Sequence, residues 1–241
     1  MHTHADDAFV VLVPAYNEEA SIAGVVSEIR QQAVGADVVV IDDGSGDGTA
    51  GAARAAGATV IRLQHNLGIG GAVQTGYRYA VAQGYRYVVR MDGDGQHDAS
   101  CIGALLSPLR SGQADVVIGT RFGGQGTYRA PIARALGIRL FSLLVRLVTG
   151  QRFTDTTSGF QACTLRAARF LAARLPSDYP EIEGLILLCR AGFRVQEVAV
   201  TMRARQSGVS SIGRLRALYY VLKVTLAVCI DLLRPAPVGE E

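Results

Sequence analysis

The sequence predicts an α/β fold, in which helices flank a mostly parallel central sheet. Two observations support this expectation. Several short apolar runs lack the polar alternation of a half-exposed strand, and uninterrupted apolar runs are typical of strands buried on both faces of a parallel sheet. Segments with the apolar spacing of helices separate these runs, so strands and helices alternate along the first half of the chain.

The expected strands are short and rich in valine and isoleucine. The first ends in proline, and the second is entirely β-branched. In chain order the strands cover residues 9–14, 38–41, 59–63, 87–91, 116–118 and 194–200.

Helical patterns lie between the strands at residues 19–32, 49–56, 71–83 and 100–110. Later helices are expected at 132–148, 165–174, 182–191 and 215–233, with a polar segment at 154–159. The chain shows no internal repeat and no linker, so residues 1–241 are expected to form a single domain. The polar residues 1–8 are expected to be a flexible N-terminus.

The composition excludes several classes of protein. Hydrophobic residues make up 49% of the chain and charged residues 19%, which excludes a disordered protein. The net charge of +3 is too small by itself to indicate nucleic-acid binding. The four cysteines lack CxxC spacing and are expected to be buried thiols in a reducing compartment. No run of about 18 uncharged apolar residues predicts a transmembrane helix, and the acidic start is unlike a signal peptide.

Two helices of the second half are amphipathic, over residues 132–149 and 213–233. In the first, Arg134, Arg139 and Arg146 share one side and a row of leucines shares another. This pattern suits a helix lying in an anionic membrane interface, and it equally suits a helix that packs on the core with solvated arginines. Tyr219 and Tyr220 of the second helix would be interfacial anchors, or that helix would dock on a membrane partner.

Acidic clusters follow three of the predicted strands. Residues 14–19 read Pro-Ala-Tyr-Asn-Glu-Glu, residues 42–49 read Asp-Asp-Gly-Ser-Gly-Asp-Gly-Thr, and residues 92–97 read Asp-Gly-Asp-Gly-Gln-His. Ligands of open α/β sheets bind at the carboxyl ends of the strands, so the three clusters are expected to face one crevice. Aspartate and glycine are also ordinary turn and helix-capping residues, which explains a single cluster better than three.

The third cluster indicates a metal site. Asp92 and Asp94 are two residues apart at a strand end, so their side chains project to the same side, and Gly93 leaves room between them. Two carboxylates and the Gln96 oxygen suit Mg²⁺ or Mn²⁺ carrying a diphosphate. A P-loop, a complete GxGxxG motif and the common hydrolase motifs are all missing from the sequence.

These segments, with Gly119-Thr120-Arg121, resemble a family 2 glycosyltransferase with the GT-A fold, a Rossmann-like sheet flanked by helices. Within that family the chain is most similar to dolichol-phosphate mannose synthases and polyprenyl-phosphate glycosyltransferases. Glu183, the Gln196-Glu197-Val198 segment and the Arg205-x-x-Gly208-x-Ser210 segment favour this branch. The resemblance runs from about residue 9 to residue 212.

The resemblance implies a role for each matching residue. The base and ribose of a nucleoside-diphosphate sugar would be bound by Pro14, Ala15, Tyr16, Glu18, Ile41 and Asp43. Asp92, Gly93 and Asp94 would contact the donor diphosphate, and Asp92, Asp94 and Gln96 would hold the Mg²⁺ or Mn²⁺.

Two arginines and a serine complete the implied site. Arg121 would contact a phosphate or the sugar, and Arg205 with Ser211 would bind the lipid phosphate, so Asp94, Arg121 and Arg205 are the implied catalytic residues. The family often has lysine at the position of Ser211, so Arg203 or Arg214 is a candidate for the replacement cation.

The expected reaction is metal-dependent, inverting transfer of a sugar from GDP-mannose or a UDP-hexose to a polyprenyl or dolichyl phosphate. Glu181 and Glu183 are the candidates for a general base, but a phosphate acceptor needs none, because its second pKa is about 6. Two alternatives stay open: transfer to a saccharide hydroxyl, and a silent nucleotide-sugar-binding subunit of a membrane complex. The enzyme is expected on the cytoplasmic face of a membrane, peripherally bound, with a small membrane subunit as a candidate partner and no nucleic acid.

Overall fold

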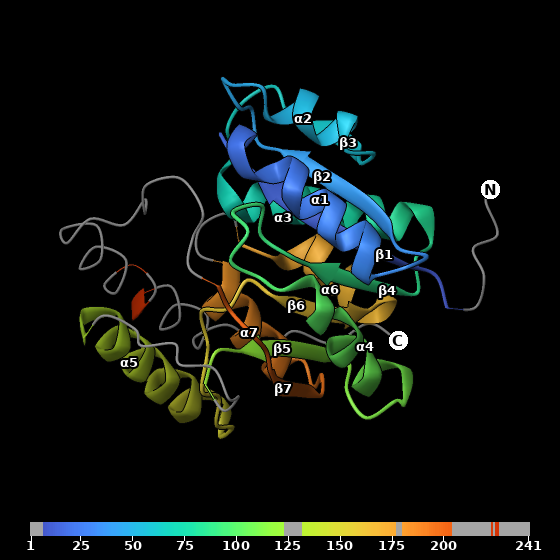
Figure 1. Ribbon diagram of the computed structural model, residues 1–241. Helices are drawn as coiled ribbons and strands as arrows, with labels where there is room; N and C mark the ends of the chain where they lie inside the picture. The colour runs from blue at the N-terminus through green and yellow to red at the C-terminus, as the bar shows by residue number, and fades with distance from the viewer. Residues whose placement is uncertain (1–6, 123–131, 177–179, 204–222, 224, 227–241) are drawn as a thin grey trace.

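The computed structural model describes residues 7–122, 132–176, 180–203, 223 and 225–226 of the chain. Within this part, seven strands form one sheet in the order β3-β2-β1-β4-β6-β5-β7, with helices on both faces (Figure 1). The strands are β1 (Phe9–Ala15), β2 (Asp37–Asp42), β3 (Thr59–Arg62), β4 (Tyr87–Arg90), β5 (Val116–Thr120), β6 (Gln161–Thr164) and β7 (Val195–Ala199). The helices are α1 (Glu19–Gln32), α2 (Thr49–Ala55), α3 (Gly68–Gln83), α4 (Ile102–Arg110), α5 (Ile132–Thr149), α6 (Leu165–Arg174) and α7 (Pro180–Arg190).

The sheet is mostly parallel, as the sequence predicts. β1 pairs in parallel with β2 and β4, β2 with β3, and β5 with β7. β6 is antiparallel to both of its neighbours, β4 and β5. Strand β6 was not predicted, because Gln161-Ala162-Cys163-Thr164 is short and has little β-branched character. Its position between two buried strands, more than its local propensity, makes it a strand.

Apolar cores cover both faces of the sheet. Val11 and Val13 of β1 belong to the core that also contains side chains of α1, α2 and α4. Val10 and Leu12 belong to the opposite core, together with α3 and α6. Side chains of one strand are thus buried on both sides, which explains why the predicted strands are continuous apolar runs.

Helix α5 packs at the edge of the molecule, at the lower left of Figure 1. A third small core joins it to β5 and α7, and comprises Ile118, Phe141, Val145, Phe153, Ile182, Leu185 and Ile186. Leu140, Leu143 and Leu147 are instead 46%, 51% and 76% exposed. Core packing therefore uses a different face of α5 from the one that carries these leucines. In the described part of the chain, no helix has the length and apolarity needed to cross a membrane.

The differences from the predicted helices lie mainly at their ends. α3 begins at Gly68, three residues before the expected start, and ends at Gln83. The next residue, Gly84, has a φ of 79°, which is typical of the residue that closes a helix. The helix expected at 100–110 begins as a 3₁₀ turn, η1 (Ala99–Cys101). Asp98 caps this turn, because its side chain accepts a hydrogen bond from the Ser100 N–H at 3.0 Å.

The two ends of the chain are described in part. Asp7 and Ala8, which we expected to be flexible, are held by partners: Arg110 forms an ion pair with Asp7 at 2.6 Å, and the Ala8 carbonyl accepts from the Arg86 N–H. Residues 1–6 lie outside the described residues. The same is true of the amphipathic helix expected at 213–233, apart from residues 223, 225 and 226.

Candidate active site

The order of the strands brings the three acidic strand ends together. β1 lies between β2 and β4, and all three run in the same direction, so their carboxyl ends share one edge of the sheet. The register places Ala15 beside Asp42, and Leu12 beside Arg90, two residues before Asp92. The fold therefore confirms the expected convergence of the three clusters.

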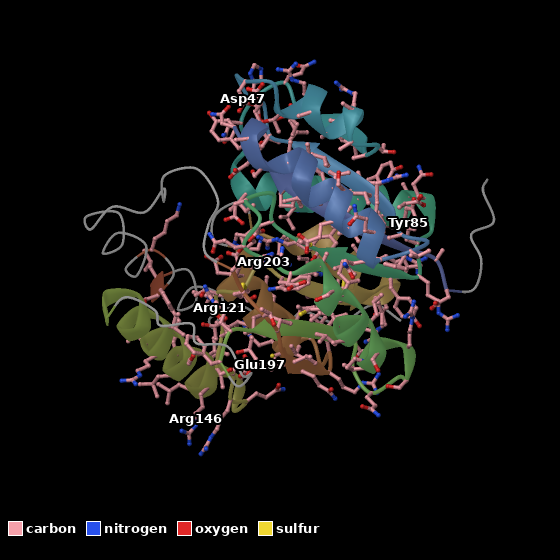
Figure 2. All side chains as sticks on the ribbon, in the orientation of Figure 1. Asp47, Tyr85, Arg121, Arg146, Glu197 and Arg203 are labelled. Atoms are coloured by element: carbon pink, nitrogen blue, oxygen red, sulfur yellow. The ribbon has the colours of Figure 1, made fainter. Side chains whose placement is uncertain are left out.

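The loops that follow β1 and β2 are tied together by hydrogen bonds. Ser45 Oγ accepts from the Asn17 N–H, and Asn17 Oδ1 accepts from the Gly46 N–H, both at 2.9 Å. Asn17 has a φ of 54°, a left-handed conformation that asparagine tolerates better than most residues. These bonds fix the backbone next to Tyr16. Asp47, at the top of Figure 2, marks the outer end of the second loop.

The residues expected to bind the base and ribose differ in exposure. Tyr16 is 49% exposed and Glu18 is half-buried, so both side chains can reach a ligand. Pro14, Ala15 and Ile41 are buried. Because the Ile41 side chain belongs to the core under α3, only the backbone at this position can contact a nucleotide.

Asp43 is the buried carboxylate of this end of the site. Its backbone N–H donates to the Ala15 carbonyl at 2.9 Å, and its Oδ1 accepts from the Leu67 N–H at 2.8 Å. Burial raises the pKa of Asp43 above the ordinary value, against the opposing effect of the backbone hydrogen bonds. An open groove lined by Gly44 and residues 62–64 begins beside it. The groove therefore begins one residue after Asp43, whose own side chain is buried and bonded to the backbone of Leu67.

Asp92 and Asp94 follow β4, and the backbone between them is closely packed. A Cβ at Gly93 would lie 3.3 Å from both the Pro14 carbonyl oxygen and Ile22 Cδ1. Ser21 Oγ donates to the Gly93 carbonyl at 2.8 Å. The segment is thus held against β1 and α1, which fixes the backbone positions of both carboxylates.

Gln96 orients the second carboxylate. Its backbone N–H donates to Asp94 Oδ1 at 3.0 Å, and its Nε2 donates to Asp94 Oδ2 at 2.8 Å. Among the described residues, no three His, Cys, Asp or Glu side chains are arranged to hold a metal ion. Mg²⁺ and Mn²⁺ commonly use one or two carboxylates and complete their shell with water and phosphate oxygens. Asp92, Asp94 and the Gln96 amide oxygen therefore fit a metal ion that is bound together with a diphosphate.

His97 lies under this segment, stacked on Phe160 with the ring centroids 4.9 Å apart. Its Nδ1 accepts from the Asp92 N–H at 3.1 Å, and its Nε2 is 3.8 Å from Asp92 Oδ2. Burial lowers the pKa of His97. The positive charges of Arg90 and Arg121 lower this pKa further, whereas the negative charges of Asp92 and Asp94 raise it. A neutral imidazole therefore supports the first carboxylate from below.

Arg121, which follows β5, is held by the buried Asp155. Arg121 Nε and Nη2 donate to the two Asp155 carboxylate oxygens, both at 2.6 Å, and Nη2 also donates to Thr157 Oγ1 at 2.7 Å. Glu197 of β7 accepts from the Asp155 N–H at 2.8 Å and from the Thr154 N–H at 2.8 Å. Arg121 and Glu197 lie close together in Figure 2. Asp155 thus positions the Arg121 guanidinium, and Glu197 in turn positions Asp155.

A buried arginine, Arg90, lies on β4 itself. Its side chain is 3% exposed, and Nη2 donates to Glu181 Oε1 of α7 at 2.6 Å. The same Nη2 is 3.6 Å from Asp92 Oδ1. Glu181, a candidate general base, is therefore engaged in a buried ion pair. The second candidate, Glu183, is 8% exposed.

The cationic residues expected after β7 are only partly described. Arg203 forms ion pairs with Glu28 at 2.7 Å and with Asp98 at 3.0 Å, and these partners raise the pKa of Arg203. It ties the chain after β7 to α1, which argues against Arg203 as the replacement phosphate cation. Arg205, Ser211 and Arg214 lie outside the described residues.

Comparison with known sequences identifies the family. Residues 10–174 match the model of glycosyl transferase family 2, which is more than half of the chain. The chain belongs to glycosyl transferase family 2. The expected resemblance is thereby confirmed.

Two relatives with similar sequences are named for phosphorylated polyprenols. The family 2 chain is 32% identical to the undecaprenyl-phosphate mannosyltransferase of Micrococcus luteus over 213 residues, which cover 85% of this chain and 87% of the relative. It is 29% identical to the polyprenol monophosphomannose synthase of Mycolicibacterium smegmatis over 214 residues, which cover 85% of this chain and 80% of the relative.

A solved structure with a similar fold is the glucosyl-3-phosphoglycerate synthase of Mycobacterium tuberculosis in complex with Mn²⁺, UDP and glucosyl-3-phosphoglycerate. It superposes with a TM-score of 0.69 at 23% identity, over 98% of this chain and 82% of that one. The likeness shows that this family 2 glycosyltransferase has a GT-A-like fold.

The sequence patterns assign no role to four residues that shape this family 2 site. They are Arg90, Asp155, Glu197 and Gly159, where a Cβ would lie 2.5 Å from Asp92 Oδ2. The sequence does contain a signal for Arg90. It is a charged residue in an otherwise apolar buried strand, and such a residue needs a partner of opposite charge. Asp155 and Gly159 belong to the polar segment 154–159. The sequence predicts no role for this segment, because its contacts are with distant parts of the chain. Glu197 was noted only as part of the family resemblance.

Proposed function

We propose that the protein is a metal-dependent, inverting glycosyltransferase that moves a sugar from a nucleoside-diphosphate sugar to a polyprenyl phosphate. The observation that carries this proposal is the shared edge of β2, β1 and β4, where Asp43, Tyr16, Asp92 and Asp94 follow three adjacent strands. The family match and the polyprenyl-phosphate substrates in the names of the two relatives support it.

The donor would lie along this edge, with its base and ribose near Tyr16, Glu18 and Asp43 and its diphosphate near Asp92 and Asp94. Asp92, Asp94 and Gln96 would hold the Mg²⁺ or Mn²⁺, which would neutralise the charge that develops on the leaving diphosphate. Gly93 would keep the two carboxylates in place beside the diphosphate, because its missing Cβ lets this segment pack closely against Pro14 and Ile22.

A phosphate acceptor fits the buried state of the glutamates. Glu181 is paired with Arg90, and Glu183 is buried, so neither is placed as an exposed general base. A phosphomonoester needs no base, because its second pKa is about 6 and it is dianionic near neutral pH. Its oxygen would attack the anomeric carbon in line as the bond to the diphosphate oxygen breaks, and the bonding electrons would leave with the diphosphate. Arg121 would supply positive charge to a phosphate.

We infer that α5 holds the enzyme at the surface of the membrane that carries the lipid. Leu140, Leu143 and Leu147 are exposed on this helix beside the exposed Arg139 and Arg146. Figure 2 shows Arg146 on the outer side of α5, away from the sheet. Exposed leucines flanked by arginines suit the boundary between acyl chains and anionic headgroups.

The experiment that tests the proposed function is a donor screen. The purified protein is incubated with radiolabelled GDP-mannose, UDP-glucose or UDP-N-acetylglucosamine, Mn²⁺ or Mg²⁺, and undecaprenyl phosphate in detergent. We expect label to enter the organic phase with one donor and to do so only with metal. The Asp94→Ala variant should lose transfer at least 100-fold, whereas Asp47→Ala, at the outer end of the β2 loop, should keep most of it. If no donor gives a lipid product, the proposal fails, and transfer of label to an added saccharide would identify a hydroxyl acceptor.

A further inference from the structure

A charged network is buried directly beneath the proposed diphosphate site. Arg90 lies on β4, a central strand, with a side chain 3% exposed. Within the described residues its Nε has no hydrogen-bond partner, and its Nη2 approaches two carboxylates, Glu181 at 2.6 Å and Asp92 at 3.6 Å. An isolated guanidinium at this depth would be expensive to bury, so the two carboxylates account for its charge. Coulombic attraction to Glu181 and Asp92 keeps the pKa of Arg90 high despite burial.

Stability alone is a weak explanation of this network. A buried ion pair gains about as much from mutual attraction as it loses in desolvation, and apolar side chains of similar size are often as stable or more so. The surroundings would accept such side chains, because the small cavity beside Arg90 is lined largely by apolar residues such as Val73, Leu171 and Leu185. A charged pair in this place therefore indicates a task other than packing.

The two oxygens of the Asp92 carboxylate have different surroundings. Oδ1 is buried, has no hydrogen-bond partner among the described residues, and faces Arg90. The side chain as a whole is 33% exposed, which leaves Oδ2 as the oxygen able to reach a ligand. Gly159 lies against the Asp92 carboxylate, since a Cβ at this position would lie 2.5 Å from Oδ2 and 2.8 Å from Oδ1. The carboxylate thus has one oxygen turned inward to a cation, and its other oxygen, 3.8 Å from His97 Nε2, is the one left for a ligand.

We propose that Arg90, anchored by Glu181 of α7, is a positioning residue that draws Asp92 Oδ1 inward and so presents Oδ2 to the metal–diphosphate. This inference rests on the proposed function, because it takes the ligand of Asp92 to be the metal ion bound to the donor diphosphate. Arg90 makes no contact with substrate. It acts by fixing one metal ligand and by linking that ligand to the first turn of α7.

The test uses paired substitutions that leave the net charge unchanged. Arg90→Gln with Glu181→Gln replaces the ion pair by two amides that can still bond to each other, and Arg90→Met with Glu181→Met replaces it by apolar packing. Neither double variant leaves a buried charge without its partner in the pair. The full-length protein is titrated with Mn²⁺ in the presence of UDP and, separately, of GDP, and the free Mn²⁺ is measured by electron paramagnetic resonance.

A positioning role and a purely electrostatic role of Arg90 predict opposite changes in Mn²⁺ affinity when the pair is removed. The positive charge of Arg90 lies 3.6 Å from Asp92, so if Arg90 acted only by repelling the metal ion, removing the pair would tighten Mn²⁺ binding. If Arg90 positions Asp92, removal should weaken the Mn²⁺ affinity about 10-fold or more, as is typical when the partner of a metal ligand is lost. A packing control, Ile29→Val in the core under α1, should lower the melting temperature and leave the Mn²⁺ affinity unchanged.

The outcomes separate this inference from the proposed function. Unchanged or tighter Mn²⁺ binding in a folded double variant would overturn the positioning role while the wild-type protein still bound Mn²⁺ with a nucleotide. Failure of the wild-type protein to bind Mn²⁺ with both UDP and GDP would instead count against the proposed function itself. If the Met pair fails to fold, the Gln pair decides the question, because its two amides keep hydrogen-bonding groups at both positions without the charges.

Discussion

Single residues around Asp92 determine how its carboxylate is held. His97 accepts from the Asp92 N–H, Arg90 lies on one side of the carboxylate, and Gly159 lies against the other. The contribution of Gly159 is the space that its missing side chain leaves. Its backbone has no positive φ, so the need for glycine here comes from the neighbouring carboxylate and not from the conformation of the chain.

Gly159→Ala should therefore impair the site more than the fold. The new Cβ would lie 2.5 Å from Asp92 Oδ2, closer than real contacts allow, so the carboxylate has to move. We expect transfer to fall about 10-fold or more, and overpacking to cost about 1–3 kcal/mol of unfolding free energy. Kinetics with saturating donor and a urea unfolding curve measure the two effects.

Gly103→Ala is the matched control, because nothing lies within 4 Å of a Cβ built at this position on α4. Alanine in a helix should raise the unfolding free energy by about 0.5–1 kcal/mol and leave transfer unchanged. Equal activity in both variants would show that Asp92 tolerates displacement.

The residues that the sequence predicts at this site are those recognisable from local spacing. Asp92, Asp94 and Gln96 form a pattern within five consecutive residues after an apolar strand, so the sequence alone is enough to propose them as a site. Glu181 meets Arg90 across 91 positions, and Glu197 meets Asp155 across 42. Such contacts depend on the order of strands in the sheet, which a single sequence does not reveal.

At the scale of secondary-structure elements, β7 fixes the segment that holds Arg121. Glu197 accepts from the N–H groups of Thr154 and Asp155, and Asp155 in turn holds the Arg121 guanidinium with two bonds of 2.6 Å. The carboxylate of β7 therefore positions an arginine that follows β5.

Glu197→Gln should lower kcat about 10-fold and leave KM for the donor nearly unchanged. The amide keeps one acceptor, but in either orientation it turns an NH₂ group toward the Thr154 N–H, so the 154–155 segment and Arg121 should shift. Gln196→Ala is the control, because the adjacent side chain of β7 donates to the Gln113 carbonyl and makes no contact with this segment. A lower melting temperature with unchanged kcat would show that Glu197 serves the fold alone.

Helix α5 was predicted almost to the residue, but its orientation was left open between the membrane and the core. The structure places Phe141 and Val145 in the core and leaves Leu143 and Leu147 exposed, so one face of the helix packs on the core and another faces outward. Strand β6 shows the opposite case, since its four residues carry little local signal and are ordered by their neighbours. Periodicity can find an amphipathic helix, whereas a short buried strand depends on contacts made elsewhere.

Replacing Leu143 and Leu147 by serine should reduce membrane binding. Each leucine would lose the free energy of inserting its side chain, at about 25 cal/mol per Å² of buried apolar surface. We expect the fraction bound to vesicles of phosphatidylglycerol and phosphatidylcholine to fall several-fold in a flotation assay. Val34→Ser is the control, because Val34 is 84% exposed on the turn that precedes β2, away from α5. Equal flotation of the leucine variant and the wild-type protein would contradict the assignment of α5 to the membrane.

Over the whole molecule, ion pairs connect segments that are far apart in the chain. Asp7 pairs with Arg110 and Glu28 with Arg203, so the beginning of the described chain is tied to α4, and α1 to the segment after β7. The α/β class was predictable because strand and helix patterns alternate over the first half of the chain. The topology of the second half was not, because the antiparallel β6 inserts between β4 and β5 and sends β7 to the far edge.

Acid should destabilise the whole fold in a predictable direction. Hydrogen bonds hold the pKa values of Asp47, Asp98 and Asp115 below the ordinary value, in Asp115 chiefly through Arg194. Each group binds a proton more readily in the unfolded chain than in the native state. Its stabilisation is therefore complete above the unfolded pKa of about 3.9 and is lost as the pH falls through the lower, native pKa.

Asp115→Asn should accordingly flatten the acid limb of the stability curve. Asparagine keeps an oxygen for the Arg194 side chain but cannot lose stability by protonation, so the melting temperatures of the variant and the wild-type protein should differ most at pH 6 and converge toward pH 3. Asp37→Asn is the comparison, because Asp37 accepts from the Tyr85 hydroxyl at 2.7 Å at the other end of the sheet, shown by Tyr85 in Figure 2. Thermal unfolding followed by circular dichroism at half-unit pH steps measures both variants. A constant difference between Asp115→Asn and the wild-type protein from pH 6 to pH 3 would show that Arg194 stabilises the carboxyl group equally in its charged and neutral forms.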